Sequence, residues 1–102
     1  MKVSKKLLKR IIFELWPLNR SITGNDVRKS HSILSKISKF KKIEIKSNKK
    51  VFDWKVPSEW IIKDAYVINP DGKKILSFKE NNLSILNYSK PFKGILKLEE
   101  LK

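Results

Sequence analysis

The hydrophobic residues between Ser4 and Trp16 recur at intervals of three and four positions, which predicts an amphipathic helix. Pro17 ends this helix because proline lacks a backbone N–H. A basic amphipathic helix could also lie on a membrane surface, but the pattern favours a helix that packs on a core. The apolar side of the helix carries Leu7, Leu8, Ile11, Ile12, Leu15 and Trp16, opposite lysines and Arg10.

A second helix is predicted to begin near Asn25, which follows Gly24 and is a residue type favoured at helix N-termini. Four hydrophobic positions would face inward on this helix: Val27, Leu34, Ile37 and Phe40. We expect the two helices to pack against each other as a pair.

After Phe40 the hydrophobic pattern changes to a period of two, which is typical of strands with one buried face. Ile43 and Ile45 are separated from the alternating segment 51–56 by the turn-prone residues 47–50. This region therefore predicts a hairpin.

Three further strands are predicted at 61–68, 74–78 and 84–88. The first two are joined by Asn69-Pro70-Asp71-Gly72, in which proline presets φ and glycine accepts a positive φ. Asn81-Asn82 would form the turn before the last strand. The predicted fold class is α+β, with two N-terminal helices followed by a small antiparallel β-rich region.

The chain length bounds the fold, because 102 residues hold at most one small domain. A helical pattern at 98–102 covers about one turn, short of the 12 or so residues that a marginal isolated helix needs, so we expect an incomplete piece of a larger protein. The chain has no cysteine, which excludes disulfides and thiolate zinc sites and makes the cytoplasm the expected location. No apolar run reaches the roughly 20 residues of a membrane span.

The net charge of +14 could attract nucleic acid or an acidic surface. The surplus is nearly all lysine, however, whereas arginine is the residue that recognises phosphates and bases through a forked geometry. The composition favours solvated lysine faces. A small basic module that binds nucleic acid or an acidic partner surface stays open as the alternative function.

The search for catalytic chemistry yields few candidates. His31 is the single histidine, so a two-histidine zinc site cannot be built, and we assign it no role. Asp53, Glu59 and Asp64 lie in an aromatic-rich stretch, where paired carboxylates can have a raised pKa. Asp53 nevertheless alternates with aromatic residues, which is typical of an outward polar position on a strand. We predict no catalytic residue and no metal ligand in this chain.

The loop between the two predicted helices is the best candidate for a binding site. It contains Arg20, Ser21, Thr23 and Gly24, and a guanidinium beside two hydroxyls near a helix N-terminus could hold a carboxylate or a phosphate. The same side chains could instead cap the helix and fix the loop to the core.

Several longer motifs in one order make the sequence resemble the bacterial aminopeptidase-like proteins, often described as polysaccharide-biosynthesis proteins with an aminopeptidase-like domain. The segments that carry the resemblance are LWPLNRSITGNDVRK at 15–29, KVFDWKVPSEW at 50–60, DAY at 64–66, NLSILNYSKP at 82–91 and LEEL at 98–101. Family members are much longer than this chain. They combine a zinc-aminopeptidase-like α/β domain, an inserted domain of unknown function and a C-terminal winged helix.

The resemblance implies that residues 1–42 are the N-terminal helical part of the aminopeptidase-like domain and that residues 43–102 are an incomplete β-rich part of the inserted domain. In the family, the zinc ligands are histidine and acidic residues that lie beyond the position matching Lys102. No cofactor is therefore expected in this chain, although zinc is implied for full-length relatives. The implied function is an N-terminal fragment of a zinc metallopeptidase that is inactive alone.

Such a chain would need the missing C-terminal part of the same protein or a companion chain as its partner. A truncated gene, a fragment and one half of a split protein are all compatible with the sequence.

Overall fold

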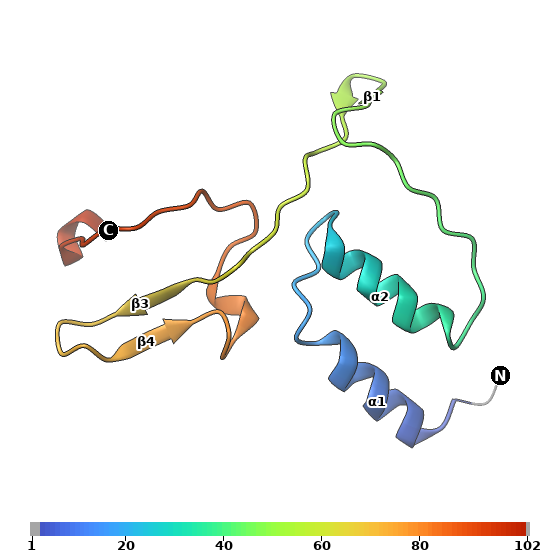
Figure 1. The fold of residues 1–102 in the computed structure, drawn as a ribbon, viewed down its shortest axis with the longest axis horizontal. Coiled ribbons are helices and arrows are strands. Elements are labelled where there is room, and N and C mark those ends of the chain that lie inside the picture. Colours follow the sequence, from blue (N-terminus) through green and yellow to red (C-terminus); the bar gives the residue numbers. More distant parts are fainter. Residues whose placement is uncertain (1–2, 102) are drawn as a thin grey trace.

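The computed structural model describes residues 3–101. Its N-terminal part is a pair of helices lying side by side (Figure 1). Helix α1, Lys5–Leu15, begins after Ser4, whose Oγ accepts a hydrogen bond of 3.2 Å from the backbone N–H of Leu7. Helix α2, Asn25–Ser35, is capped by Gly24 and not by Asn25. Both predicted helices are confirmed.

Only part of the apolar surface of these helices is covered. Leu7, Ile11 and Leu15 of α1 are half-buried, whereas the adjacent Leu8, Ile12 and Trp16 are exposed. After α2 begins, Val27 and Ile37 are half-buried as predicted. The prediction that Leu34 and Phe40 face inward is wrong, because their side chains are 36% and 43% exposed.

A small hairpin follows a long extended connection (Figure 1). Strand β1, Lys50–Val51, pairs antiparallel with β2, Trp54–Lys55, around a turn at Phe52 and Asp53. The backbone N–H of Val56 continues the pairing by donating to the carbonyl of Lys49 at 2.9 Å. The predicted pairing of 43–45 with 51–56 is therefore wrong, since both strands come from 50–55 and residues 43–45 lie in no strand.

The second hairpin joins β3, Tyr66–Ile68, to β4, Lys74–Ser77, in antiparallel register. The predicted turn between them is confirmed. Gly72 has a φ of 79°, in the left-handed region that favours glycine, and the Asn69 Oδ1 accepts a 2.9 Å hydrogen bond from the backbone N–H of Lys73. The first strand of the pair is shorter than predicted and begins at Tyr66.

The rest of the chain contains two short 3-10 helices, η1 at Asn82–Ser84 and η2 at Leu98–Leu101. The predicted strand at 84–88 is wrong, because Asn81 caps η1 by accepting a 3.0 Å hydrogen bond from the backbone N–H of Leu83. The last predicted segment ends at Lys102, which lies outside the described residues. The predicted class is confirmed: the fold is α+β, with two helices and two separate antiparallel strand pairs.

The elements enclose very little core. The molecule measures 53 × 43 × 19 Å, and its radius of gyration is 18.1 Å, compared with about 13 Å for a compact domain of 100 residues. It exposes 9557 Å², whereas a compact 12.0 kDa protein exposes about 6000 Å². Among residues 3–101, Val56 is the one hydrophobic side chain that is buried, at 9% exposure. The described chain therefore leaves most of its apolar surface uncovered.

Within the described residues, no helix is both long and apolar enough to cross a membrane.

Candidate functional site

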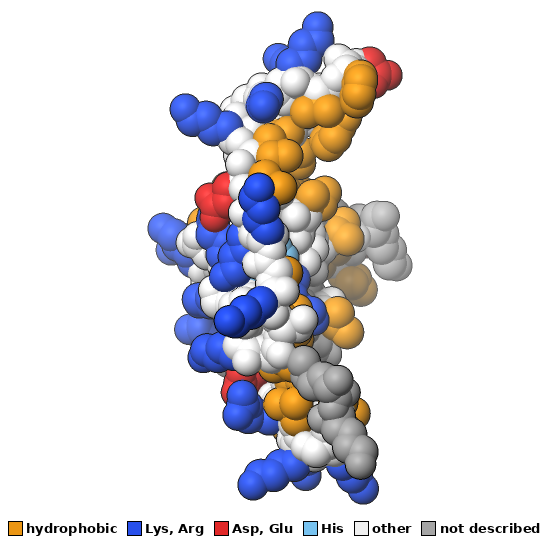
Figure 2. Space-filling model, turned by 90° about the vertical axis from the view of Figure 1, so that its right-hand side faces the viewer, with side chains coloured by type: hydrophobic (Ala, Val, Ile, Leu, Met, Phe, Trp, Pro, Cys, Tyr) orange, Lys and Arg blue, Asp and Glu red, His pale blue; other side chains and the backbone are white. Residues whose placement is uncertain are grey.

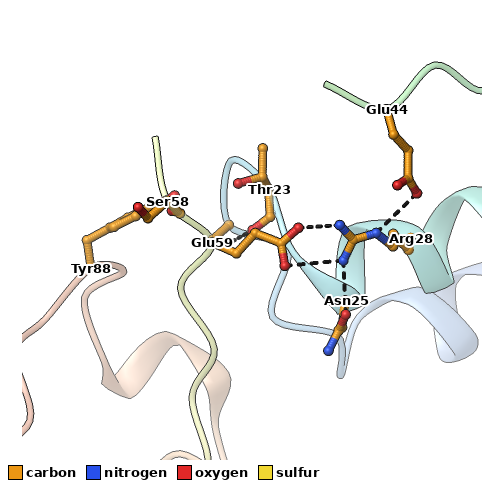
Figure 3. Close-up of polar contacts among 8 residues, drawn as sticks. Thr23, Asn25, Arg28, Glu44, Ser58, Glu59 and Tyr88 are labelled. Carbon is orange, nitrogen blue, oxygen red and sulfur yellow. Dashed lines mark hydrogen bonds and ion pairs between the residues drawn. The ribbon is translucent and has the colours of Figure 1, made fainter. Parts of the chain in front are cut away.

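Arg28, on the first turns of α2, joins three separate parts of the chain (Figure 3). Its guanidinium forms a two-pronged pair with Glu59, in which Nη1 donates to Oε2 at 3.2 Å and Nη2 donates to Oε1. Its Nε donates to Glu44 Oε1 at 3.2 Å, and Nη1 also donates to Asn25 Oδ1 at 3.0 Å. Arginine suits such a site because its planar fork matches a carboxylate. The segments 42–45 and 57–60 are thus both held to α2.

The electrostatics of this cluster favour the ionised pair. The hydrogen bonds from Arg28 lower the pKa of the Glu59 carboxyl below its ordinary value of 4.5, and the hydrogen bonds to Glu59 and then Glu44 raise the pKa of Arg28. The sequence-based suggestion that Glu59 could have a raised pKa is therefore wrong. Its carboxylate is charged and satisfied, so it is poorly suited to act as a proton donor.

The lowered pKa of Glu59 predicts a titration that depends on Arg28. The stabilising contribution of the pair is present above the ordinary pKa of 4.5, and it is lost as the pH falls through the lower pKa of the folded state. In Arg28→Met, the NMR titration of the Glu59 carboxyl carbon should move up towards its ordinary pKa. Arg10→Met is the matched control, because Arg10 pairs with Glu14 at 3.4 Å and does not contact Glu59. An unchanged Glu59 titration in Arg28→Met would contradict the assignment.

A second junction lies next to Glu59. Trp60 Nε1 donates a 3.0 Å hydrogen bond to the carbonyl of Ser89, and the Tyr88 hydroxyl donates one of 3.1 Å to the carbonyl of Ser58. The rings of Trp60 and Tyr88 are stacked, with centroids 6.2 Å apart. Stacked aromatic pairs of this kind add to the stability that burial provides. These contacts tie residues 88–89 to the segment that Arg28 holds.

The predicted loop site is placed at the start of α2, but its members do not converge. The Ser21 Oγ donates to the carbonyl of Thr23 at 2.8 Å, and Gly24 has a φ of 140° and lies close to the carbonyl of Trp60. Arg20 is exposed, and although its backbone N–H donates to the carbonyl of Leu18 at 3.1 Å, its side chain forms no hydrogen bond or ion pair within residues 3–101. The Thr23 Oγ1 is buried without a hydrogen-bond partner among the described residues. Ser21 thus fixes the loop, and the Arg20 side chain has no partner among the described residues.

A pocket of about 410 Å³ lies beside the Arg28 cluster. Its polar lining includes Thr23, Arg28, Glu44 and Glu59, and its apolar lining includes Ile22, Val27, Ile43 and Ile45. Arg28, Glu44 and Glu59 are already paired with each other, whereas Lys42, which also lines the pocket, forms no ion pair with the described residues. We therefore regard the cluster as a structural junction between segments.

The other candidate residues lie apart from this cluster or on its edge. His31 lines the same pocket, and its ring lies edge-on to the ring of Phe40 with the two centroids 6.1 Å apart. Asp53 is exposed in the β1–β2 turn, and Asp64 forms an ion pair of 3.4 Å with Lys79. The described part of the chain brings no three histidine or acidic side chains together in a way that could hold a metal ion. The residues present therefore do not fit a catalytic zinc ion, which needs three protein ligands.

Sequence reasoning did not assign a role to Arg28 or Glu44. Arg28 could have been found from its place in segment 15–29, which is one of the segments that carry the family resemblance. The three longest of these segments contact one another in the fold. Arg28 belongs to 15–29, Glu59 and Trp60 belong to 50–60, and Tyr88 belongs to 82–91.

Comparisons with known proteins match this arrangement to part of a larger one. A Clostridium acetobutylicum protein named "Putative polysaccharide biosynthesis protein with aminopeptidase-like domain" is 53% identical over 92 residues, which are 90% of this chain and 21% of that protein. The chain is related to the aminopeptidase-like proteins. It spans about a fifth of the length of the curated relative that it matches.

A solved structure supports the same relationship. The crystal structure of a "putative peptidase" from Clostridium acetobutylicum matches with a TM-score of 0.82 and 52% identity, over 90% of this chain and 22% of that one. Residues 59–102 also match a family described as "Domain of unknown function (DUF2172)". The open arrangement of this chain thus occurs as one part of a much longer protein described as a putative peptidase.

Proposed function

We propose that this chain is a non-catalytic part of an aminopeptidase-like hydrolase and acts only together with the rest of such a protein. The observation that carries the proposal is the combination of 53% identity over 90% of this chain with coverage of only 21% of the relative. The printed name of the relative also motivates a link to polysaccharide biosynthesis.

The proposed division places residues 1–42 in the helical part of an aminopeptidase-like domain and 43–102 in a β-rich domain of unknown function. The two helices end before Phe40, and all four strands lie after Lys49, which supports a change of architecture in this region. The match of 59–102 to a separate family supports the assignment of the second part.

Zinc chemistry in such a protein would depend on ligands outside this chain. The acidic side chains Glu44 and Glu59 are both hydrogen-bonded to Arg28. Carboxylates held by a guanidinium are poorly available to a metal ion.

The loop Arg20, Ser21, Thr23 and Gly24 is proposed to lie beside the substrate cleft of the complete protein. The exposed Arg20 would contact a substrate carboxylate or phosphate, while Ser21 and Gly24 fix the loop. Substitution by alanine of the residue that matches Arg20 in the Clostridium acetobutylicum relative should raise KM and leave the melting temperature unchanged. A lower melting temperature with unchanged kinetics would favour a purely structural loop.

The proposal predicts that the purified chain neither binds zinc stoichiometrically nor cleaves aminoacyl p-nitroanilides. Metal analysis after dialysis against zinc, followed by an assay with a panel of such substrates, checks both properties. The complete relative, assayed in parallel, controls for the choice of substrates. One zinc ion per chain or measurable turnover by the chain would refute the proposal.

A basic binding module is the second candidate function, and Figure 2 provides the observation that favours it. Lysine and arginine side chains gather towards one side of the flat molecule, and most hydrophobic side chains in this view lie towards the other side. This candidate predicts binding of duplex or single-stranded nucleic acid that weakens steeply with salt. A flat titration at low salt would eliminate it.

A further inference from the structure

The outer side of α1 carries hydrophobic side chains that the described chain does not cover. Leu8, Ile12 and Trp16 are 50%, 61% and 50% exposed, and their spacing of four places them in one row along the helix. This exposed row, Leu8, Ile12 and Trp16, lies directly beside the half-buried row, Leu7, Ile11 and Leu15. The two rows together make an apolar arc of about half of the helix circumference, wider than the stripe of about 100° that one contact requires.

The helix is built to present this row in a fixed orientation. Ser4 caps its first turn, and the carbonyl of Trp16 accepts a 2.7 Å hydrogen bond from the Asn82 Nδ2. Arg10 and Glu14 form an ion pair on the polar side. Among helices and strands of the described chain, α2 is the one that packs on α1, so the exposed row has no intramolecular partner there.

The amount of uncovered surface identifies the kind of occupant. The exposed area of 9557 Å² exceeds the area expected for a compact protein of this mass by about 3600 Å², more than four times the roughly 800 Å² that one partner buries in a standard interface. A net charge of +14 also disfavours a second copy, because two such chains would repel each other. A larger body that surrounds the chain fits both observations.

The part of the relatives that lies outside the matched region is large enough to be this body. About four-fifths of the curated relative lies outside the matched region, and the open arrangement of this chain recurs with a TM-score of 0.82 as 22% of a solved peptidase-like chain. We propose that the exposed row Leu8, Ile12 and Trp16 on α1 is a docking surface for the remaining part of an aminopeptidase-like protein. The inference rests on the proposed function and adds the surface through which the parts join.

The chemistry of the surface specifies its partner. An apolar groove would receive the exposed row, and acidic residues at the rim of the groove would face Lys5 and Lys9, which flank the row on the same helix. Such a contact buries a continuous hydrophobic strip with positive charges at its edge.

The test uses the Clostridium acetobutylicum relative without its matched region, immobilised, with this chain as the soluble partner. The wild-type chain should bind in a saturable manner. Ile12→Gln should weaken binding about 30-fold, because a buried isoleucine side chain contributes about 2 kcal/mol. Lys6→Gln is the matched control, since Lys6 is exposed on the polar side of α1 and the same residue is introduced.

Three outcomes decide the matter. Weakened binding of Ile12→Gln with unchanged binding of Lys6→Gln supports the docking surface. Equal binding of both variants and wild type overturns the docking surface and leaves the proposed function intact. No binding by the wild-type chain, when circular dichroism shows that both parts are folded, overturns the proposed function and the docking surface with it. Unchanged helicity of Ile12→Gln by circular dichroism excludes loss of α1 as the cause.

Discussion

The isolated chain should show no cooperative unfolding transition in a calorimetric scan. A compact domain of about 100 residues absorbs 60–80 kcal/mol at its midpoint, roughly, because it exposes a large apolar core on unfolding. In this chain Val56 is the one buried hydrophobic side chain among the described residues. We therefore expect a heat-capacity curve without an unfolding peak, together with strong binding of a hydrophobic dye.

Binding of the remaining part of an aminopeptidase-like protein should give the chain a cooperative unfolding transition. Mixing the chain with the part of the Clostridium acetobutylicum relative outside the matched region should produce a transition that neither part shows alone, and dye binding should fall. A single sharp peak of about 70 kcal/mol from the isolated chain would contradict the absence of a core.

The second large effect is expected from Trp60→Ala. This substitution removes the stacking on Tyr88 and the hydrogen bond to the carbonyl of Ser89, which join residues 88–89 to the Arg28 junction. Full burial of tryptophan makes its truncation cost about 3–5 kcal/mol, and because Trp60 is half-buried we expect about 2 kcal/mol. In the mixture with the part of the Clostridium acetobutylicum relative outside the matched region, hydrogen exchange of the amides in 82–89 should then be about 30-fold faster.

Two control variants separate the contributions at this position. Trp60→Phe keeps an aromatic ring and loses the hydrogen bond, so it should cost about 1 kcal/mol. Trp54→Ala makes the same truncation in β2, where the side chain is exposed, and should leave exchange in 82–89 unchanged. Equal exchange in wild type and Trp60→Ala would show that the junction does not hold the C-terminal part.

The local elements that the sequence predicted correctly are those whose signals lie within a few residues. Helix α1 depends on its amphipathic spacing and its Ser4 cap, and the β3–β4 hairpin depends on a turn in which Gly72 accepts a positive φ. In these cases the residues that determine the element are also the residues that form it.

The hairpin at 50–55 shows where local signals failed. Phe52 has a φ of 53° and is 91% exposed, and a bulky aromatic residue is among the least expected at a left-handed turn position. Propensity therefore favoured the polar segment 47–50 as the hairpin turn. A turn does form at 47–48, where the backbone N–H of Lys49 donates to the carbonyl of Lys46, but it does not join two strands. The strand predicted at 84–88 did not form because asparagine side chains tend to hydrogen-bond to nearby backbone groups. Asn81 starts η1 in this way.

The junction around Arg28 could not be predicted from local patterns. Arg28 and Glu59 are 31 positions apart, and the path of the intervening chain determines whether they come into contact. Burial predictions failed for a different reason. Leu34 and Phe40 follow a pattern that is typical of core positions, but both side chains are exposed in the described structure. These exposed positions agree with the proposal that the chain acts together with the rest of a longer protein.

The most direct test of this account is small-angle X-ray scattering from an equimolar mixture of the chain and the part of the Clostridium acetobutylicum relative outside the matched region. If the chain is a dependent part of an aminopeptidase-like protein, the mixture should scatter as a one-to-one complex whose curve superposes on that of the intact relative. The free chain should have a radius of gyration near 18.1 Å. A mixture curve equal to the sum of the two separate curves, with a free chain near the 13 Å or so of a compact domain, would contradict the account.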